Sequence, residues 1–161
     1  KILKFKITQK MNAPFIIPSI LSSITPLTAT QASRTRNFDI SNPGMNMQSG
    51  THRINNKLFD ENRIDETVSA NAIEIWQFDN SQGDEPHPMH IHGIDFQVLQ
   101  RIGGRNSLIA SESGWKDTVL VMPGEIVKVI VPFGSNPGRF VFHCHNLEHE
   151  GDGMMLQYQL S

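Results

Sequence analysis

The later part of the chain alternates short apolar stretches with turn residues, and this rhythm limits the folds that it can adopt. Residues 73–78 (IEIWQF) alternate with the period of two that is typical of a β-strand. Further strand candidates lie at 89–100, 118–122, 125–133, 139–145 and 154–160, with glycine- and proline-containing turns between them. No segment has a convincing amphipathic helical period. The pattern predicts an all-β fold, a Greek-key β-sandwich or barrel.

Composition narrows the classes of protein to which the chain can belong. Its 161 residues suffice for one domain with a core that needs no disulfide. The net charge of -2 indicates neither a nucleic-acid partner nor an anionic membrane surface. No apolar run approaches the roughly 20 residues of a membrane span. The single cysteine, Cys144, excludes an internal disulfide, so it serves packing or chemistry.

The first fifty residues follow a different pattern. Residues 8–50 are rich in Ser, Thr, Asn and Pro and predict a long loop excursion, interrupted by a strand candidate at 37–40. A strand-like run at 2–7 predicts an edge strand before this loop. Lysines ahead of an apolar stretch resemble a secretory signal, but prolines interrupt that stretch. Since the chain opens on a strand without Met, we expect a processed product or a fragment.

Histidines carry the strongest functional signal in the sequence. Six of the seven fall in two clusters, with His87, His90 and His92 in HPMHIHG and His143, His145 and His149 in HCHNLEHEGDGMM. Six imidazoles grouped around the only cysteine would be costly in a core unless they bind metal. His52 stands alone, and we expect it to be structural.

The second cluster indicates which metal is bound. Cys144, His149 and Met154 follow one another with four residues between each pair. A thiolate, an imidazole and a weak axial thioether are ligands of a blue copper site, which needs one further histidine, and His87 is the natural candidate. Zinc gains little from a thioether and usually takes close pairs such as Cys-x-x-Cys. The spacing therefore favours copper over zinc.

Strand geometry assigns the histidines beside Cys144 to a second site. Because side chains alternate faces along a strand, His143 and His145 should point to one side and Cys144 to the other. His90 and His92 are also two residues apart and should share one face. These four imidazoles would form half of a second metal site. An electron entering at Cys144 would leave through His143 or His145.

Three motifs resemble the C-terminal cupredoxin domain of the multicopper oxidases, a family that includes laccases, bilirubin oxidase and cuprous oxidases. They are HPMHIHG, GWKDTV at 114–119 and HCHNLEHEGDGMM. The likeness is close over the motif-bearing core at 70–160, weaker at 54–65 and unclear in 8–50. It implies that residues 1–161 form a single C-terminal cupredoxin domain, with the N-terminal domains absent from this chain. It also implies an exported protein, periplasmic or extracellular.

The resemblance implies a role for each ligand. It assigns His87, Cys144, His149 and axial Met154 to type-1 copper, His90 to type-2 copper, and His92, His143 and His145 to the type-3 pair. The family couples one-electron oxidation of a reductant, such as a small phenol or a metal ion, to four-electron reduction of O2 to water at a trinuclear cluster. Glu150 matches the residue that relays protons, with a solvated carboxylate as the alternative.

The resemblance also implies a partner. The family's trinuclear cluster takes eight histidines, and half come from N-terminal cupredoxin domains of the same precursor, which we expect as a separate chain. An electron-transfer cupredoxin without oxidase activity is the main alternative, but it has no use for the histidines beside Cys144. A copper protein like nitrite reductase is a third possibility, against which His145 argues.

Three further residues lie in these motifs or next to them. Asp84 and Glu85 precede His87, and we expect them in a solvated turn, with binding of a cationic or phenolic donor as the alternative. Trp115 is expected in the core.

Overall fold

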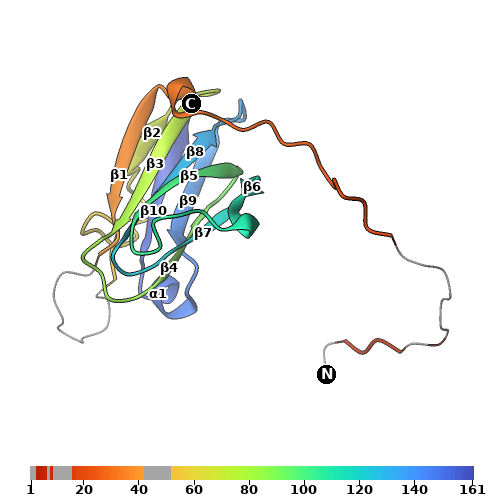
Figure 1. Cartoon of the computed structure of the whole chain (residues 1–161). Coiled ribbons are helices and arrows are strands. Elements are labelled where there is room, and N and C mark those ends of the chain that lie inside the picture. The colour runs from red at the N-terminus through yellow and green to blue at the C-terminus, as the bar shows by residue number, and fades with distance from the viewer. Residues whose placement is uncertain (1–2, 7, 9–15, 42–51) are drawn as a thin grey trace.

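The computed structural model describes residues 3–6, 8, 16–41 and 52–161, and in these residues two five-stranded sheets face each other (Figure 1). The first sheet contains, in order, β1 (Arg34–Asp39), β3 (Ile73–Asn80), β8 (Glu125–Pro132), β5 (Phe96–Gly103) and β6 (Trp115–Lys116). The second contains β2 (Glu66–Val68), β10 (Met155–Leu160), β9 (Gly138–Cys144), β4 (His87–Ile91) and β7 (Thr118–Val121). The prediction of an all-β sandwich is confirmed.

Short helical turns complete the described part. They are α1 (Leu147–Gly151) and two 3-10 turns, η1 (Ala29–Gln31) and η2 (Ala110–Glu112). Neighbouring strands are antiparallel except in the pairs β1–β3 and β2–β10, which are parallel. Across the described ranges, no helix has the length and apolar character that crossing a membrane requires.

Aromatic side chains from both sheets meet in the core. The ring centroid of Trp76 on β3 lies 4.9 Å from that of Phe38 on β1 and 4.9 Å from that of Phe142 on β9. Tyr158 of β10 packs edge-on against Trp76 at 5.6 Å. All four residues are buried. Because burial of each large apolar side chain contributes about 1.5–3 kcal/mol, this cluster holds β9 and its metal-ligand candidates against the first sheet.

The predicted strand at 89–100 is wrong as one element, because the chain breaks there into β4 and β5. β4 belongs to the second sheet and β5 to the first, so residues 92–95 cross from one layer to the other. Gly93 has φ +78°, a conformation that favours glycine, and a Cβ there would lie 2.6 Å from the ring of Phe140. Apolar alternation continues on both sides of this corner, which hides it in the sequence.

Three expectations for other segments also need correction. The strand predicted at 37–40 begins earlier, as β1. The prediction missed its first residues because they are polar and mostly face outward. Of the expected edge strand at 2–7, the described residues 3–6 lie outside both sheets, and 2 and 7 fall outside the described residues. Trp115 is 42 % exposed on β6 rather than in the core. Within the long excursion at 8–50, positions 9–15 and 42–50 also lie outside the described residues.

An ion-pair network centred on the buried carboxylate of Glu125 links β5 to β8. Nη1 of Arg101 donates to Oε2 of Glu125 at 2.7 Å, and Nε of Arg105 donates to Oε1 of Glu125 at 2.7 Å. Arg101 also pairs with Glu112 of η2. Burial alone would raise the pKa of Glu125, but hydrogen bonds from Arg105 and the backbone of Met122, with the charge of Arg101, outweigh it and lower the pKa to about 2.

Candidate metal centre

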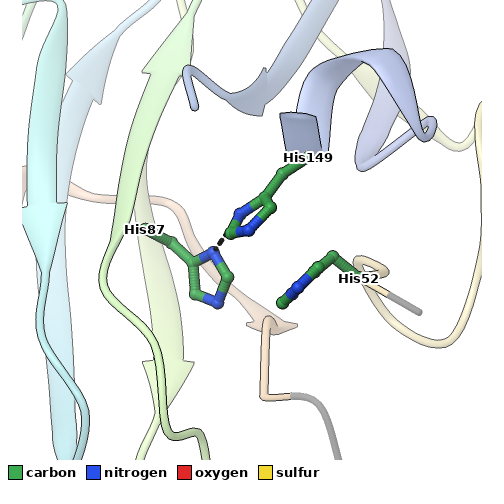
Figure 2. A group of neighbouring side chains, drawn as sticks. All are labelled: His52, His87 and His149. Carbon is green, nitrogen blue, oxygen red and sulfur yellow. Dashed lines mark hydrogen bonds between the residues drawn. The ribbon is translucent and has the colours of Figure 1, made fainter. Parts of the chain in front are cut away.

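Three donor side chains converge where β4 begins and β9 ends, and we call His87, Cys144 and His149 the cysteine group. Nδ1 of His87 lies 3.2 Å from Nδ1 of His149, as Figure 2 shows. Sγ of Cys144 lies 3.6 Å from Nδ1 of His87 and 3.5 Å from Nδ1 of His149. Each of the three atoms therefore faces the other two.

The turn after β9 brings His149 back over Cys144. The side chain of Asn146 caps α1 by accepting a hydrogen bond from the backbone N–H of Glu148 at 3.1 Å. Beyond this single helical turn, the backbone N–H of Met154 donates to His149 O, and the N–H of Cys144 donates to Met154 O. Met154 is buried and is tied through its backbone to both residues.

The spacing of these donors fits a metal ion. Bonds of about 2.0 Å to nitrogen and about 2.3 Å to sulfur hold the ligand atoms of a first-row metal about 3.3–3.8 Å apart in tetrahedral or trigonal sites. The two separations from sulfur to nitrogen, 3.5 and 3.6 Å, fall within that range, and the separation of 3.2 Å between the two nitrogen atoms lies 0.1 Å below it. A thiolate with two imidazoles is the donor set of a copper site in which a thioether is the usual weak axial ligand.

Burial leaves these donors uncharged in the absence of metal. It lowers the pKa of His87 to about 3, with the neighbouring rings of His149 and His52 adding to the shift. Burial, followed by the ring of His52, also lowers the pKa of His149. Burial raises the pKa of the Cys144 thiol to about 11. The two imidazoles therefore present free lone pairs, while a bound metal would displace a proton from the thiol.

Four other imidazoles gather on the opposite side of β9, and we call His90, His92, His143 and His145 the histidine group. Nε2 of His92 lies 3.0 Å from Nε2 of His143. Donor atoms of His90, His92 and His143 all lie within 4.8 Å of one another. The ring of His145 lies 5.3 Å from that of His143 and 5.5 Å from that of His90. The four rings thus line one face.

Hydrogen bonds orient two of these rings. Nδ1 of His90 lies 2.8 Å from the backbone carbonyl of Asp117 and 3.1 Å from Oγ1 of Thr118. Nδ1 of His143 lies 3.0 Å from the carbonyl of Cys144. A bond at one ring nitrogen fixes the tautomer and leaves the other nitrogen available to a metal. In both residues that available atom is Nε2.

Burial lowers the pKa of two members of the histidine group. Burial, followed by the ring of His90, lowers the pKa of His92. Burial also lowers the pKa of His143, although its hydrogen bond to the Cys144 carbonyl and the charge of Glu150 oppose the shift. Oε2 of Glu150 lies 3.6 Å from Nδ1 of His143, and the side chain is partly exposed. Glu150 therefore contacts His143 on one side and solvent on the other.

Side-chain alternation along β9 separates the two groups. Cys144 faces His87 and His149, whereas His143 and His145 face His90 and His92. In the pairing of β4 with β9, Cys144 lies opposite Met89, and His143 lies opposite His90. The strand therefore places the candidate ligands of two metal sites on adjacent residues.

Sequence reasoning missed two neighbours of the cysteine group. The ring of His52 stacks on the ring of His149, with centroids 3.7 Å apart and an angle of 21° between the planes (Figure 2). Oε2 of Glu85 lies 3.1 Å from Nε2 of His149. His52 is isolated in the sequence and gave no signal. Glu85 lies two residues before His87, which indicated a position near the cysteine group, but a solvated turn accounted for the same sequence equally well.

Comparison with known proteins gives a consistent set of relatives. The multicopper oxidase family model matches residues 27–161. A multicopper oxidase of Staphylococcus aureus is 42% identical over 111 residues, covering 67% of this chain and 24% of that protein. The bilirubin oxidase of Albifimbria verrucaria is 31% identical and covers 98% of this chain and 28% of that protein. The chain thus spans about a quarter of these relatives.

Solved structures agree in fold. The crystal structure of laccase from Pediococcus acidilactici superposes with a TM-score of 0.79 at 36% identity, covering 92% of this chain and 31% of that one. The multicopper oxidase McoA of Aquifex aeolicus superposes with a TM-score of 0.75 at 30% identity, covering 88% of this chain and 32% of that one.

Proposed function

The chain belongs to the multicopper oxidase family, and from that premise we propose that it is the C-terminal cupredoxin domain of a laccase-like oxidase. In this proposal the cysteine group and axial Met154 hold type-1 copper. His90 holds type-2 copper, and His92, His143 and His145 hold the type-3 pair. Bound copper would supply one-electron oxidation of a reducing substrate coupled to four-electron reduction of O2 to water.

One observation carries the proposal: adjacent residues of β9 belong to two separate donor groups. Cys144 lies in the cysteine group, while His143 lies in the histidine group with its Nε2 3.0 Å from Nε2 of His92. Only a few covalent bonds separate the Cys144 sulfur from the His143 imidazole. The chain therefore offers a short covalent path between the site that accepts electrons and the site that uses them.

The histidine group requires a partner surface. Its four imidazoles come from one side only, and His92 and His145 are exposed in this chain. We propose that N-terminal cupredoxin domains of the same precursor, as a second polypeptide, supply the remaining imidazoles. Oxidase activity would then depend on that partner. The relatives are about four times as long as the part that this chain matches, so proteins of this family have room for such domains.

Glu150 has the position of a proton donor to the histidine group. Its carboxylate contacts Nδ1 of His143 at 3.6 Å, and its side chain is 35% exposed. A carboxylate in contact with solvent on one side and with the site on the other can pass protons inward. Passing protons does not require Glu150 to bind metal.

For the natural reductant we propose a chemical class rather than a single compound. A small phenol or a metal ion suits a site of this kind, and relatives of the chain are named laccase and bilirubin oxidase. We also propose that the protein is exported, to the periplasm or the extracellular space.

Copper content and the optical spectrum of the native, copper-loaded protein test the proposal. We expect an intense thiolate band together with the near-ultraviolet shoulder of a bridged copper pair, and a second polypeptide on a gel. Cys144→Ser should remove the thiolate band and keep the near-ultraviolet shoulder. One copper per chain without that shoulder would instead support an electron-transfer cupredoxin.

A further inference from the structure

His149 is almost enclosed by two side chains that are not in the proposed ligand set. Its side chain is only 6% exposed. His52 covers one face of its ring, with centroids 3.7 Å apart. Glu85 lies at its edge, with Oε2 3.1 Å from Nε2. The imidazole of His149 is therefore held by His52 on one face and by Glu85 at one edge.

The contact at the edge has a defined donor and acceptor. Nδ1 of His149 points at Cys144 and His87, so it is the atom that would bind copper. A neutral imidazole that binds a metal through Nδ1 carries its proton on Nε2. That N–H lies beside the carboxylate of Glu85, whose Oε2 is 3.1 Å from Nε2. Carboxylates in this position orient metal-bound histidines and increase their basicity.

Donor atoms of His52, His87 and His149 lie within 4.8 Å of one another, but the stacked ring of His52 is badly oriented to share a metal with His149. A histidine nitrogen binds metal through a lone pair in the plane of its ring. The planes of His52 and His149 are only 21° apart and stacked, so their lone pairs run side by side rather than converging. No described residue bonds to the buried Nδ1 of His52. What His52 gains at this position is its contact with His149.

The turn before β4 holds Glu85 in place although its side chain is half exposed. Nδ2 of Asn80, a fully buried residue, donates to the backbone carbonyl of Glu85 at 2.8 Å. Oε2 of Glu85 also lies 3.8 Å from Nε2 of His52. One carboxylate oxygen therefore approaches both imidazoles, and the backbone that carries it is anchored in the core.

We propose that His52 and Glu85 are positioning residues for the type-1 copper ligand His149, with His52 fixing the plane of the ring and Glu85 increasing its electron donation. The proposal rests on the copper assignment given above. It has a consequence for redox chemistry: a carboxylate at Nε2 favours cupric over cuprous copper and so keeps the reduction potential low.

Glu85→Gln tests the effect on potential, because the amide can still accept the hydrogen bond but carries no charge. In the copper-loaded protein we expect the equilibrium with a reference redox couple to shift towards the cuprous form by about tenfold, which equals about 59 mV for one electron. The matched control is Asp84→Asn, which removes a neighbouring exposed carboxylate. An equal potential in Glu85→Gln and wild type, or an equal shift in Asp84→Asn, would overturn the role of Glu85.

His52→Ala and His52→Phe test the role of the stacked ring. Removal of the ring should loosen His149, lower copper affinity about tenfold in competition with a chelator, and broaden the copper signals in electron paramagnetic resonance. Phenylalanine keeps an aromatic face and should restore both. Wild-type affinity in His52→Ala, or no rescue by His52→Phe, would contradict stacking as the function of His52.

The wild-type protein separates this inference from the proposed function. A wild type without the thiolate band would refute the copper assignment itself. A wild type with that band, together with unchanged variants, would refute only the positioning roles of His52 and Glu85.

Discussion

The buried carboxylate of Glu125 offers a quantitative test of what holds the sandwich together. Glu125→Gln keeps the shape of the side chain but removes the charge that Arg101 and Arg105 share. The pKa of Glu125 falls from 4.5 to about 2 in the folded chain. Since each pKa unit corresponds to about 1.4 kcal/mol, the ionised carboxylate contributes about 3 kcal/mol at neutral pH.

The sign of the pH dependence follows from the lowered pKa. The stabilisation by Glu125 is complete above pH 4.5 and is lost as the pH falls from there to about 2. In wild type the carboxyl is then protonated and resembles the amide of the variant. The free energies of unfolding of wild type and Glu125→Gln should therefore differ by about 3 kcal/mol at pH 7 and converge near pH 2.

Denaturant unfolding followed by tryptophan fluorescence measures this difference, because Trp76 lies in the core. Asp84→Asn removes an exposed carboxylate, so its free energy of unfolding should match that of wild type at every pH. A difference between wild type and Glu125→Gln that stayed constant from pH 7 to pH 2 would refute the assignment of the stabilisation to the charge of Glu125.

Three other predictions concern the surroundings of the metal groups. Tyr158→Phe should lower the free energy of unfolding by about 1 kcal/mol, since its hydroxyl donates to His92 O at 2.7 Å; calorimetry without a shift in melting temperature would contradict this. Gly93→Ala should destabilise by about 1–3 kcal/mol, because φ is +78° and the new Cβ would meet Phe140; a melting temperature equal to wild type would argue against that strain. Copper removal by a chelator should lower thermal stability, by about 2.7 kcal/mol relative to protein with free copper at a hundred times its dissociation constant. If type-1 copper is the stabilising ion, the same chelator should leave the melting temperature of Cys144→Ser unchanged. A melting temperature that falls in this variant as much as in wild type would contradict that assignment.

The sandwich was largely predictable because its strands differ from its turns in local pattern. β3, β7, β8, β9 and β10 all fall near the predicted ranges. The corner between β4 and β5 was not, because alternation continues across it. Trp115 was misplaced for a related reason: apolarity predicts burial in general, but β6 lies at the edge of its sheet, where a side chain can stay exposed.

The donor groups were predictable only as far as local spacing reaches. The period of two along β9 divided Cys144 from His143, and the structure has this division. The approach of His52 to His149 depends on how distant segments pack, and the sequence contains no signal for it. Neighbours of a metal ligand that come from another part of the chain are found through tertiary structure alone.

The pairing of β9 with β4 also bears on how the chain reaches its native state. Cys144 is paired with Met89, and His143 is paired with His90. A slip of β9 by one residue would turn every side chain of the strand to the opposite face. Cys144 would then meet the histidine group, and both donor groups would be lost together. Because a misaligned β4–β9 pair retains neither donor group, copper uptake can distinguish the correctly folded sandwich from a compact but misregistered one.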